Sequence, residues 1–100
     1  MLTKVAKLSD LPPGTMKTAS LAGEEVALVN LDGEVLALDG ICPHAYCSVA
    51  AGDLHGETLT CLCHGSEFDV RTGAVLTPPA KEPLRTYRVI VEGDDILIEA

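Results

Sequence analysis

Apolar and polar positions follow one another in short runs along this 100-residue chain, and turn-forming residues interrupt the runs at close intervals. Short runs of this kind are typical of strands, and many short strands separated by turns indicate an all-β sandwich or barrel. We therefore expect one all-β domain that spans residues 1–100. The predicted strands are 4–8, 15–21, 25–31, 34–39, 58–61, 67–70, 86–92 and 96–99.

Particular turn residues sharpen this pattern. Asp32 and Gly33 lie between two strands and form a strong two-residue hairpin signal. Residues 93–95 are expected to join the last two strands in the same way. Residues 76–79 end in two prolines and cannot form a central strand, because proline lacks the N–H that a ladder needs. Residues 50–53 are expected to form either one helical turn or a loop.

Potential metal ligands are concentrated in two short loops. All four cysteines and two of the three histidines lie there. Reduced to ligand types, the loops read Cys42-x-His44 and Cys61-x-x-His64, with sixteen residues between His44 and Cys61. Two thiolates and two imidazoles can hold Zn²⁺ or an iron–sulfur cluster. Common zinc frameworks use other spacings, whereas one Cys and one His per loop suits a [2Fe–2S] cluster with Cys₂ on one iron and His₂ on the other.

These loops resemble those of the Rieske proteins. The match extends from the ligand pattern to Cys47, Cys63, Gly65 and Ser66, and it is close to the high-potential Rieske subunits of respiratory and photosynthetic complexes. The resemblance covers essentially the whole chain. It implies an antiparallel β-sandwich or barrel as a base domain, with a small inserted cluster-binding subdomain at about residues 41–79.

The resemblance assigns the ligands of one [2Fe–2S] cluster. It implies that Cys42 and Cys61 hold the buried iron as thiolates, and that His44 and His64 hold the outer iron. Neutral imidazoles in place of thiolates raise the reduction potential above that of an all-cysteine cluster. In the family the second nitrogen of each imidazole faces solvent or a partner. We therefore expect a potential that is flat at low pH and falls at high pH.

Residues around the ligands carry further expectations from the family. Cys47 and Cys63 match a pair that forms a disulfide in high-potential members, although two reduced thiols are the alternative that a cytoplasmic location favours. Ser66 matches a serine that donates to a bridging sulfide; a turn-capping serine is the alternative. Gly65 is expected to let the backbone pass close to the cluster, or to act as an ordinary turn glycine. Pro78 resembles a proline segment that covers the cluster, or belongs to a plain turn.

One position departs from the high-potential pattern. Phe68 stands where those members place a tyrosine that donates to a cysteine sulfur. Phenylalanine cannot donate, so one donor, Ser66, is kept and one is lost. We therefore expect an intermediate potential. A second feature separates the chain from another subgroup. Many Rieske ferredoxins of oxygenase systems lack a cysteine pair at the positions of Cys47 and Cys63, so this chain departs from them by having it.

The composition limits the classes of partner that this protein can bind and the places where it can reside. The formal net charge of -8 disfavours nucleic acid and anionic membranes, and it suits a basic docking patch on a partner protein. No apolar run approaches the roughly 20 residues of a membrane span. The first residues contain no apolar stretch like that of a secretory signal peptide. We expect a soluble cytoplasmic protein, unlike the membrane-anchored Rieske subunits.

The inventory of side chains argues against an enzyme. A mononuclear iron site needs two further histidines and a carboxylate, and only His55 remains once His44 and His64 are assigned. No catalytic residue is predicted. We expect a one-electron carrier that takes electrons from a reductase and passes them to a terminal oxidoreductase such as a ring-hydroxylating oxygenase. The alternatives are a Rieske subunit of a larger oxidoreductase complex and a structural zinc module for protein interaction.

Overall fold

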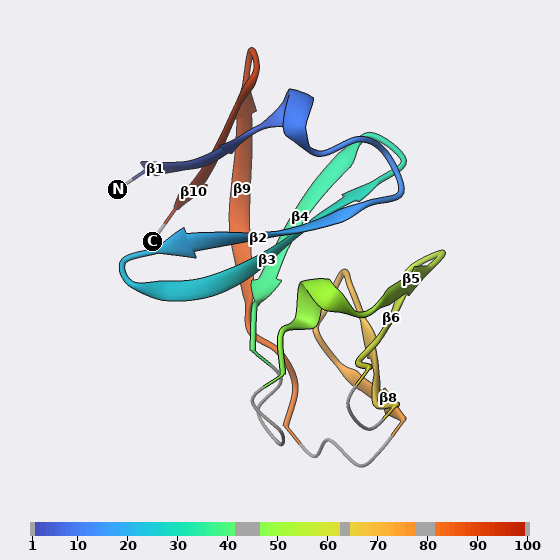
Figure 1. The fold of residues 1–100 in the computed structure, drawn as a ribbon. Helices are drawn as coiled ribbons and strands as arrows, with labels where there is room; N and C mark the ends of the chain where they lie inside the picture. Colours follow the sequence, from blue (N-terminus) through green and yellow to red (C-terminus); the bar gives the residue numbers. More distant parts are fainter. Residues whose placement is uncertain (1, 42–46, 63–64, 78–81, 100) are drawn as a thin grey trace.

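A computed structural model describes residues 2–41, 47–62, 65–77 and 82–99. These residues form antiparallel strands in two sheets, together with two single 3₁₀ turns, and the all-β expectation is confirmed (Figure 1). The elements in chain order are β1 (Leu2–Lys7), η1 (Leu8–Asp10), β2 (Met16–Leu21), β3 (Glu24–Leu31), β4 (Glu34–Asp39), η2 (Val49–Ala51), β5 (Asp53–His55), β6 (Thr58–Thr60), β7 (Glu67–Asp69), β8 (Val75–Thr77), β9 (Thr86–Glu92) and β10 (Asp95–Glu99).

The larger sheet, which we call the base sheet, has the strand order β1-β10-β9-β4-β3-β2. Its two edge strands, β1 and β2, also contact each other, so the sheet curls almost into a barrel. No helical segment of the described residues is long and apolar enough to cross a bilayer.

Hairpin turns join the strands of the base sheet much as the sequence predicts. Leu31 pairs with Glu34, and the two residues between them, Asp32 and Gly33, have φ values of 54° and 99°. Positive φ at both positions is the type I′ geometry that matches strand twist, so this prediction is confirmed. The last hairpin is tighter than expected, because Asp95 already pairs with Glu92 and belongs to the strand.

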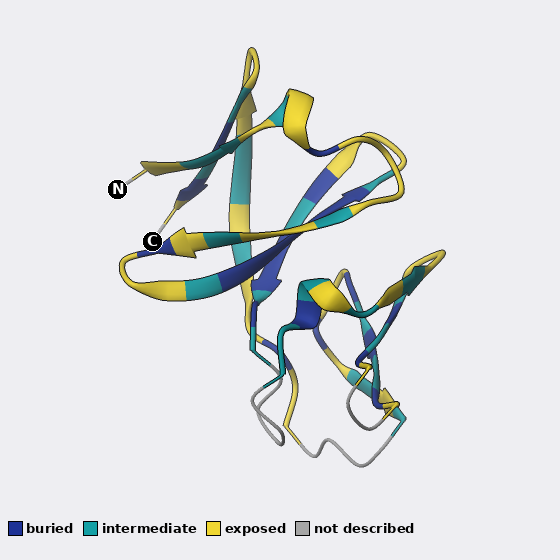
Figure 2. Cartoon of the chain, viewed as in Figure 1, coloured by how far each residue is buried: buried dark blue, intermediate teal, exposed yellow. Residues whose placement is uncertain are grey.

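Strand β3 is buried on both faces. Val26 and Leu28 point to one side, and Ala27 and Val29 to the other, since side chains alternate along a strand. All four are fully buried, which explains the unbroken apolar run at residues 26–29 within this strand (Figure 2). The inner side faces the base core, whose buried residues are Leu11, Leu21, Val26, Leu28, Val35, Ala37, Ile96 and Ile98.

The outer side of β3 and β4 carries the smaller sheet, which we call the small sheet. Its strand order is β5-β6-β7-β8. Ala27, Val29 and Leu38 of the base sheet pack against it in a second core, which we call the shared core. The remaining buried members of the shared core are Val49, Leu59, Cys61, Phe68, Val70 and Leu84.

The small sheet is an insertion between two neighbouring strands of the base sheet. Strand β4 pairs directly with β9, through Ala37 with Tyr87 and Leu38 with Thr86. The chain therefore leaves the base sheet after β4, forms η2 and β5–β8, and returns to the adjacent strand. Figure 1 shows the small sheet at one end of the base sheet, below β3 and β4 in this view.

Several short elements differ from the sequence prediction. Strand β5 and turn η1 were not expected, and η2 lies one residue earlier than the possible helical turn at 50–53. Strand β8 pairs only with β7, so it is an edge strand, which agrees with the exclusion of a central strand at 76–79. These elements have three residues each. Strands β6 and β7 are as short, but their alternation of apolar and polar residues continues to Cys61 and Val70, which made them predictable.

Candidate metal centre

The second ligand loop is the hairpin connection between β6 and β7. Alternation along β6 places Leu59 and Cys61 on the same inward side, and both are fully buried. Of the cysteines that the structure describes, Cys61 has a free thiol. Strand β6 thus delivers a cysteine sulfur to the shared core at the point where the loop begins.

Two backbone hydrogen bonds close this loop. The Cys61 N–H donates to the Ser66 carbonyl at 2.8 Å, and the Gly65 N–H donates to the Cys61 carbonyl at 3.0 Å. Gly65 has a φ of +75°, which favours glycine, and among the described residues no atom lies within 4 Å of a Cβ placed there. The turn conformation therefore explains Gly65, while its close approach to the cluster stays a prediction.

The first ligand loop leaves the base sheet after β4 and is closed at its neck. Ile41 and Ser48 form an antiparallel bridge, and the Val49 N–H donates to the Gly40 carbonyl at 2.7 Å. The predicted ligands Cys42 and His44 lie between these closing contacts in the sequence, but outside the described residues.

The two loops begin at the same core. Val49, directly after the first loop, and Cys61, at the start of the second, are both fully buried in the shared core. Cys47 packs against the same core. The fold thus brings together the bases of both loops, which sixteen intervening residues alone do not ensure. His64, like Cys42 and His44, lies outside the described residues, so the full ligand set stays a prediction.

Cys47 is disulfide-bonded, unlike Cys61. The two other cysteines of the chain, Cys42 and Cys63, lie outside the described residues. The predicted pairing of Cys47 with Cys63 is compatible with this arrangement and remains a prediction.

The surroundings of Cys61 fit an iron–sulfur cluster. A thiolate is a soft ligand, and here it lies among the apolar side chains of the shared core beside fully buried Ser66. Burial and low polarity are among the properties that set the potential of such a centre. The described residues contain no group of three or more histidine, cysteine or acidic side chains able to hold a metal ion, and three of the four predicted ligands lie outside them.

The other predicted neighbours of the cluster have mixed outcomes. Ser66 is fully buried next to the loop, and donation from its hydroxyl to a sulfide stays a prediction. Phe68 is fully buried and faces the shared core from β7, where it pairs with Leu59. Pro78 lies outside the described residues. His55 is exposed, and Arg71 forms ion pairs with Glu34 and Glu57.

A polar cluster that the sequence analysis missed lies where the insertion leaves and rejoins the base sheet. The Asp39 carboxylate accepts hydrogen bonds from Arg85 and from the Tyr87 hydroxyl. Burial alone would raise the pKa of Asp39, but the hydrogen bonds from Arg85 and Tyr87 outweigh it and hold this pKa below its usual value. Burial and the hydrogen bond to Asp39 raise the pKa of Tyr87.

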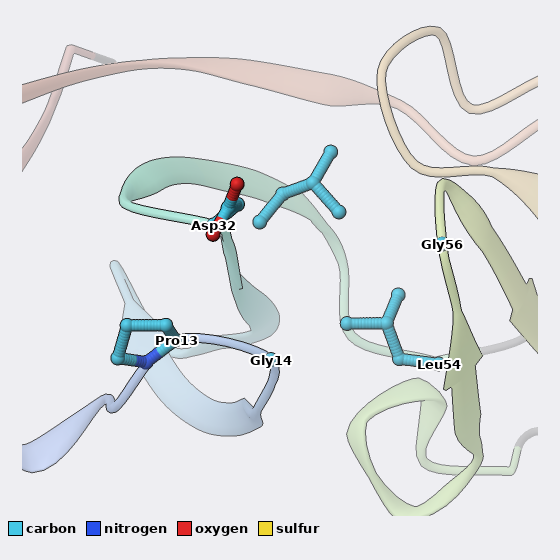
Figure 3. A pocket seen from close by; sticks show the side chains of 6 residues that line it. Pro13, Gly14, Asp32, Leu54 and Gly56 are labelled. Carbon is cyan, nitrogen blue, oxygen red and sulfur yellow. The ribbon is translucent and has the colours of Figure 1, made fainter.

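A shallow groove of about 320 Å³ lies between the two sheets (Figure 3). Pro13 and Asp32 line one side, and Leu54 lines the other. The described residues that line it include no histidine or cysteine. The groove thus supplies no soft ligand, and the loops around Cys61 remain the candidate metal centre.

Comparison with known proteins identifies the family. The model of the Rieske [2Fe–2S] domain matches residues 1–88. The biphenyl dioxygenase ferredoxin subunit of Pseudomonas sp. (strain KKS102) is 38% identical over 98 residues, which cover 97% of this chain and 90% of that relative.

Solved structures agree with this match. The ferredoxin of carbazole 1,9a-dioxygenase from Nocardioides aromaticivorans IC177 has a TM-score of 0.91 and 36% identity, covering 98% of this chain and 96% of that one. A ferredoxin in complex with the reduced oxygenase of carbazole 1,9a-dioxygenase has a TM-score of 0.89 and 28% identity, covering 97% and 91%.

These similarities confirm three expectations from the sequence: the Rieske fold, one [2Fe–2S] cluster, and an electron-transfer component rather than a catalytic enzyme. They decide against the zinc module. The chain belongs to the Rieske [2Fe–2S] domain family.

Proposed function

We propose that this protein is the ferredoxin component of a ring-hydroxylating dioxygenase system. It would accept one electron from a reductase and pass it to an oxygenase that acts on an aromatic compound. The observation that carries this proposal is the similarity to dioxygenase ferredoxins over nearly the full length of both chains. The aromatic substrates in the names of those relatives, biphenyl and carbazole, suggest the substrate class.

The proposed ligands are Cys42 and Cys61 for one iron and His44 and His64 for the other. When bound, the cluster supplies the one-electron redox chemistry. The chain contributes the buried Cys61 thiol, the closed turn around it, and the common core beneath both loops. We take residues 41–79 as the cluster-binding subdomain of a single Rieske domain.

The proposal includes two features near the cluster. Cys47 pairs with Cys63, which would tie the first ligand loop to the second; the disulfide state of Cys47 and the free thiol of Cys61 support this pairing. Ser66, buried beside Cys61, donates its hydroxyl to a cluster sulfide, and Pro78 covers the cluster. Alkylation without reductant, followed by mass spectrometry, tests the disulfide. Labelling of both Cys47 and Cys63 in the holo protein would remove it.

A docking surface for the oxygenase is proposed at the ligand-loop end of the small sheet. Leu62, which follows Cys61, is 63% exposed, and Leu76 in the edge strand β8 is 53% exposed. Exposed leucines beside a redox centre suit an apolar contact with a partner. The net charge of -8 favours a partner with a basic rim around that contact. We propose a cytoplasmic location, because the reducing equivalents used by reductases are intracellular.

The first test is the metal content and the potential of the purified protein. We expect two irons and acid-labile sulfide per chain, and a midpoint potential that is flat at low pH and falls at high pH. The slope should reach about 59 mV per pH unit when one proton accompanies each electron. A colourless protein with zinc, or spectroscopy that shows four sulfur donors and no nitrogen, would contradict the proposal.

The second test is reconstitution. A reductase, this protein and an oxygenase from such a system should oxidise an aromatic substrate only when all three are present. Leu62→Ser should reduce the rate by weakening docking, whereas the control Val91→Ser changes an exposed apolar residue of β9 in the base sheet. If the protein instead purifies bound to a large oxidoreductase subunit, it is the Rieske subunit of a permanent complex.

A further inference from the structure

A polar contact joins the insertion that carries the candidate ligands to the base sheet at the point where the chain leaves and returns. The chain leaves the base sheet at Asp39, the last residue of β4, and returns at Arg85, just before β9. The Asp39 N–H donates to the Arg85 carbonyl at 2.9 Å, so the outgoing and returning segments are hydrogen-bonded at the point of exit.

The Asp39 side chain strengthens this contact. Its carboxylate accepts from the Arg85 backbone N–H at 2.8 Å, from the Arg85 Nε at 3.1 Å, and from the Tyr87 hydroxyl at 2.8 Å. The Asp39 side chain is 21% exposed, whereas that of Arg85 is 69% exposed. Hydrogen bonds to a charged acceptor that is mostly buried are stronger than exposed ion pairs. Asp39, rather than the arginine, is therefore the central group.

Little freedom remains between Asp39 and the first ligand loop. Gly40 follows directly, and a Cβ placed there would lie 2.6 Å from the backbone of Glu25. The Gly40 N–H donates to the Glu25 carbonyl at 2.9 Å, and the Ser48 hydroxyl donates to the Glu25 carboxylate at 2.8 Å. Both sides of the loop neck are thus fastened to β3 immediately beyond Asp39.

The returning segment is held as firmly. Leu84 precedes Arg85, is buried in the shared core, and donates its N–H to the Gly73 carbonyl at 2.8 Å. Arg85 therefore reaches Asp39 from a segment that is already attached to the turn between β7 and β8. The contact links the first ligand loop to the sheet that delivers the second.

We propose that Asp39, held by Arg85 and Tyr87, is a positioning residue that fixes the neck of the first ligand loop and so the placement of the cluster ligands on it. This inference rests on the proposed ligand role of Cys42 and His44. In this proposal Asp39 acts through Gly40 and the loop neck rather than as a ligand of the cluster. Loss of the contact should leave the fold intact while the ligand geometry becomes less uniform.

The decisive variant is Asp39→Asn. Asparagine has the same shape but is uncharged and has only one acceptor oxygen, so its amide N–H groups would face an N–H donor of Arg85. Reduced Asp39→Asn should show broader electron paramagnetic resonance lines than the wild type. It should also lose its cluster to an iron chelator about tenfold faster, the factor expected from about one hydrogen bond to a charged group.

A matched control distinguishes the loss of the Asp39 hydrogen bonds from the loss of one negative charge beside Arg85. The Glu24 carboxylate lies 3.6 Å from the Arg85 guanidinium and is 68% exposed. Glu24→Gln therefore removes one negative charge beside the same arginine without changing the Asp39 contacts. It should keep wild-type resonance lines and the wild-type rate of cluster loss. Equal changes in Glu24→Gln and Asp39→Asn would mean that charge alone matters, and would overturn the inference.

Tyr87→Phe tests the same contact with less risk to folding, since it removes one hydroxyl. It should show the effects of Asp39→Asn in weaker form. Wild-type resonance lines and cluster loss in both variants would overturn the positioning role. Iron analysis of the wild type tests the proposed function separately: a wild type without iron rejects that function, whereas an iron-loaded wild type with unaffected variants rejects only this inference.

Discussion

The base sheet and the small sheet differ in what stabilises them. Strands of the base sheet have five to eight residues and enclose a core of their own. Each strand of the small sheet has three residues, and its buried side chains pack against the outer face of β3 and β4. The base sheet can bury its apolar side by itself, whereas the small sheet depends on the base sheet.

This difference explains the position of the metal centre. Three-residue strands bury too little apolar surface to offset the entropy of ordering the loops that they carry. Covalent and metal cross-links are the usual remedy for such regions. The disulfide at Cys47 and the proposed cluster would supply such cross-links to the small sheet. We therefore expect the small sheet to open before the base sheet.

The largest expected effect is that of Phe68→Ala. Phe68 is fully buried in the shared core, and truncation of a buried phenylalanine costs about 3–5 kcal/mol of unfolding free energy. Denaturant unfolding measures the loss, and hydrogen exchange should show it concentrated in β5–β8. The comparison variant Leu28→Ala removes a base-core side chain and should expose all strands together. Identical exchange patterns would contradict the difference between the sheets.

Removal of the disulfide and the iron should destabilise the small sheet more than the base sheet. After iron is chelated and disulfides are reduced, amides of β5–β8 should exchange much faster, while those of β3, β4, β9 and β10 stay protected. Hydrogen exchange with and without treatment provides the measurement. Uniform loss of protection across both sheets would show that they unfold as one unit.

A smaller effect is expected from Gly73→Ala in the turn between β7 and β8. Gly73 has a φ of +77°, and a Cβ there would lie 1.9 Å from the Leu84 carbonyl oxygen. The clash should destabilise the protein by about 1–3 kcal/mol. Gly56→Ala is the matched control, because its φ is +59° but no atom of the described residues lies within 4 Å. A smaller loss for Gly73→Ala than for Gly56→Ala would argue against a tight junction there.

The stability that the Asp39 contact gives to the junction of the two sheets should also depend on pH. Because the pKa of Asp39 is held below its usual value in the folded state, its carboxylate stabilises the fold above the unfolded pKa of about 4. That contribution is lost as the pH falls through the folded-state pKa. The stability difference between wild type and Asp39→Asn should therefore shrink below about pH 4 in denaturant unfolding. A difference that stays constant down to pH 2 would contradict this.

The smallest effect is expected at the far corner between the sheets. Arg71 forms exposed ion pairs with Glu34 of the base sheet and with Glu57 in the turn of the small sheet. Exposed pairs contribute little and are screened by salt. Arg71→Ala should cost only a small fraction of the Phe68→Ala effect, and high salt should abolish the difference. A large, salt-independent loss in thermal unfolding would make this corner a second essential junction.

The sequence by itself determined the features that depend on neighbouring residues. The Asp32 and Gly33 hairpin follows from the positive φ that these residue types tolerate. The long strands of the base sheet follow from their apolar runs, because each is long enough to show its pattern. The ligand types in the two loops, and the resemblance that they carry, indicated the Rieske family because one Cys and one His per loop suits a [2Fe–2S] cluster better than the common zinc frameworks.

Only the tertiary structure decided the features that join distant residues. Asp39 meets Arg85 and Tyr87 across an insertion of more than forty residues, and no local pattern marks such a contact. The packing of the small sheet on the outer face of β3 is likewise a contact between distant residues that no local pattern marks. Strands β5 and β8 were not predicted because β5 has a single apolar residue, Leu54, and β8 ends directly before two prolines. Their strand form depends on pairing with β6 and β7, which the folded chain alone supplies.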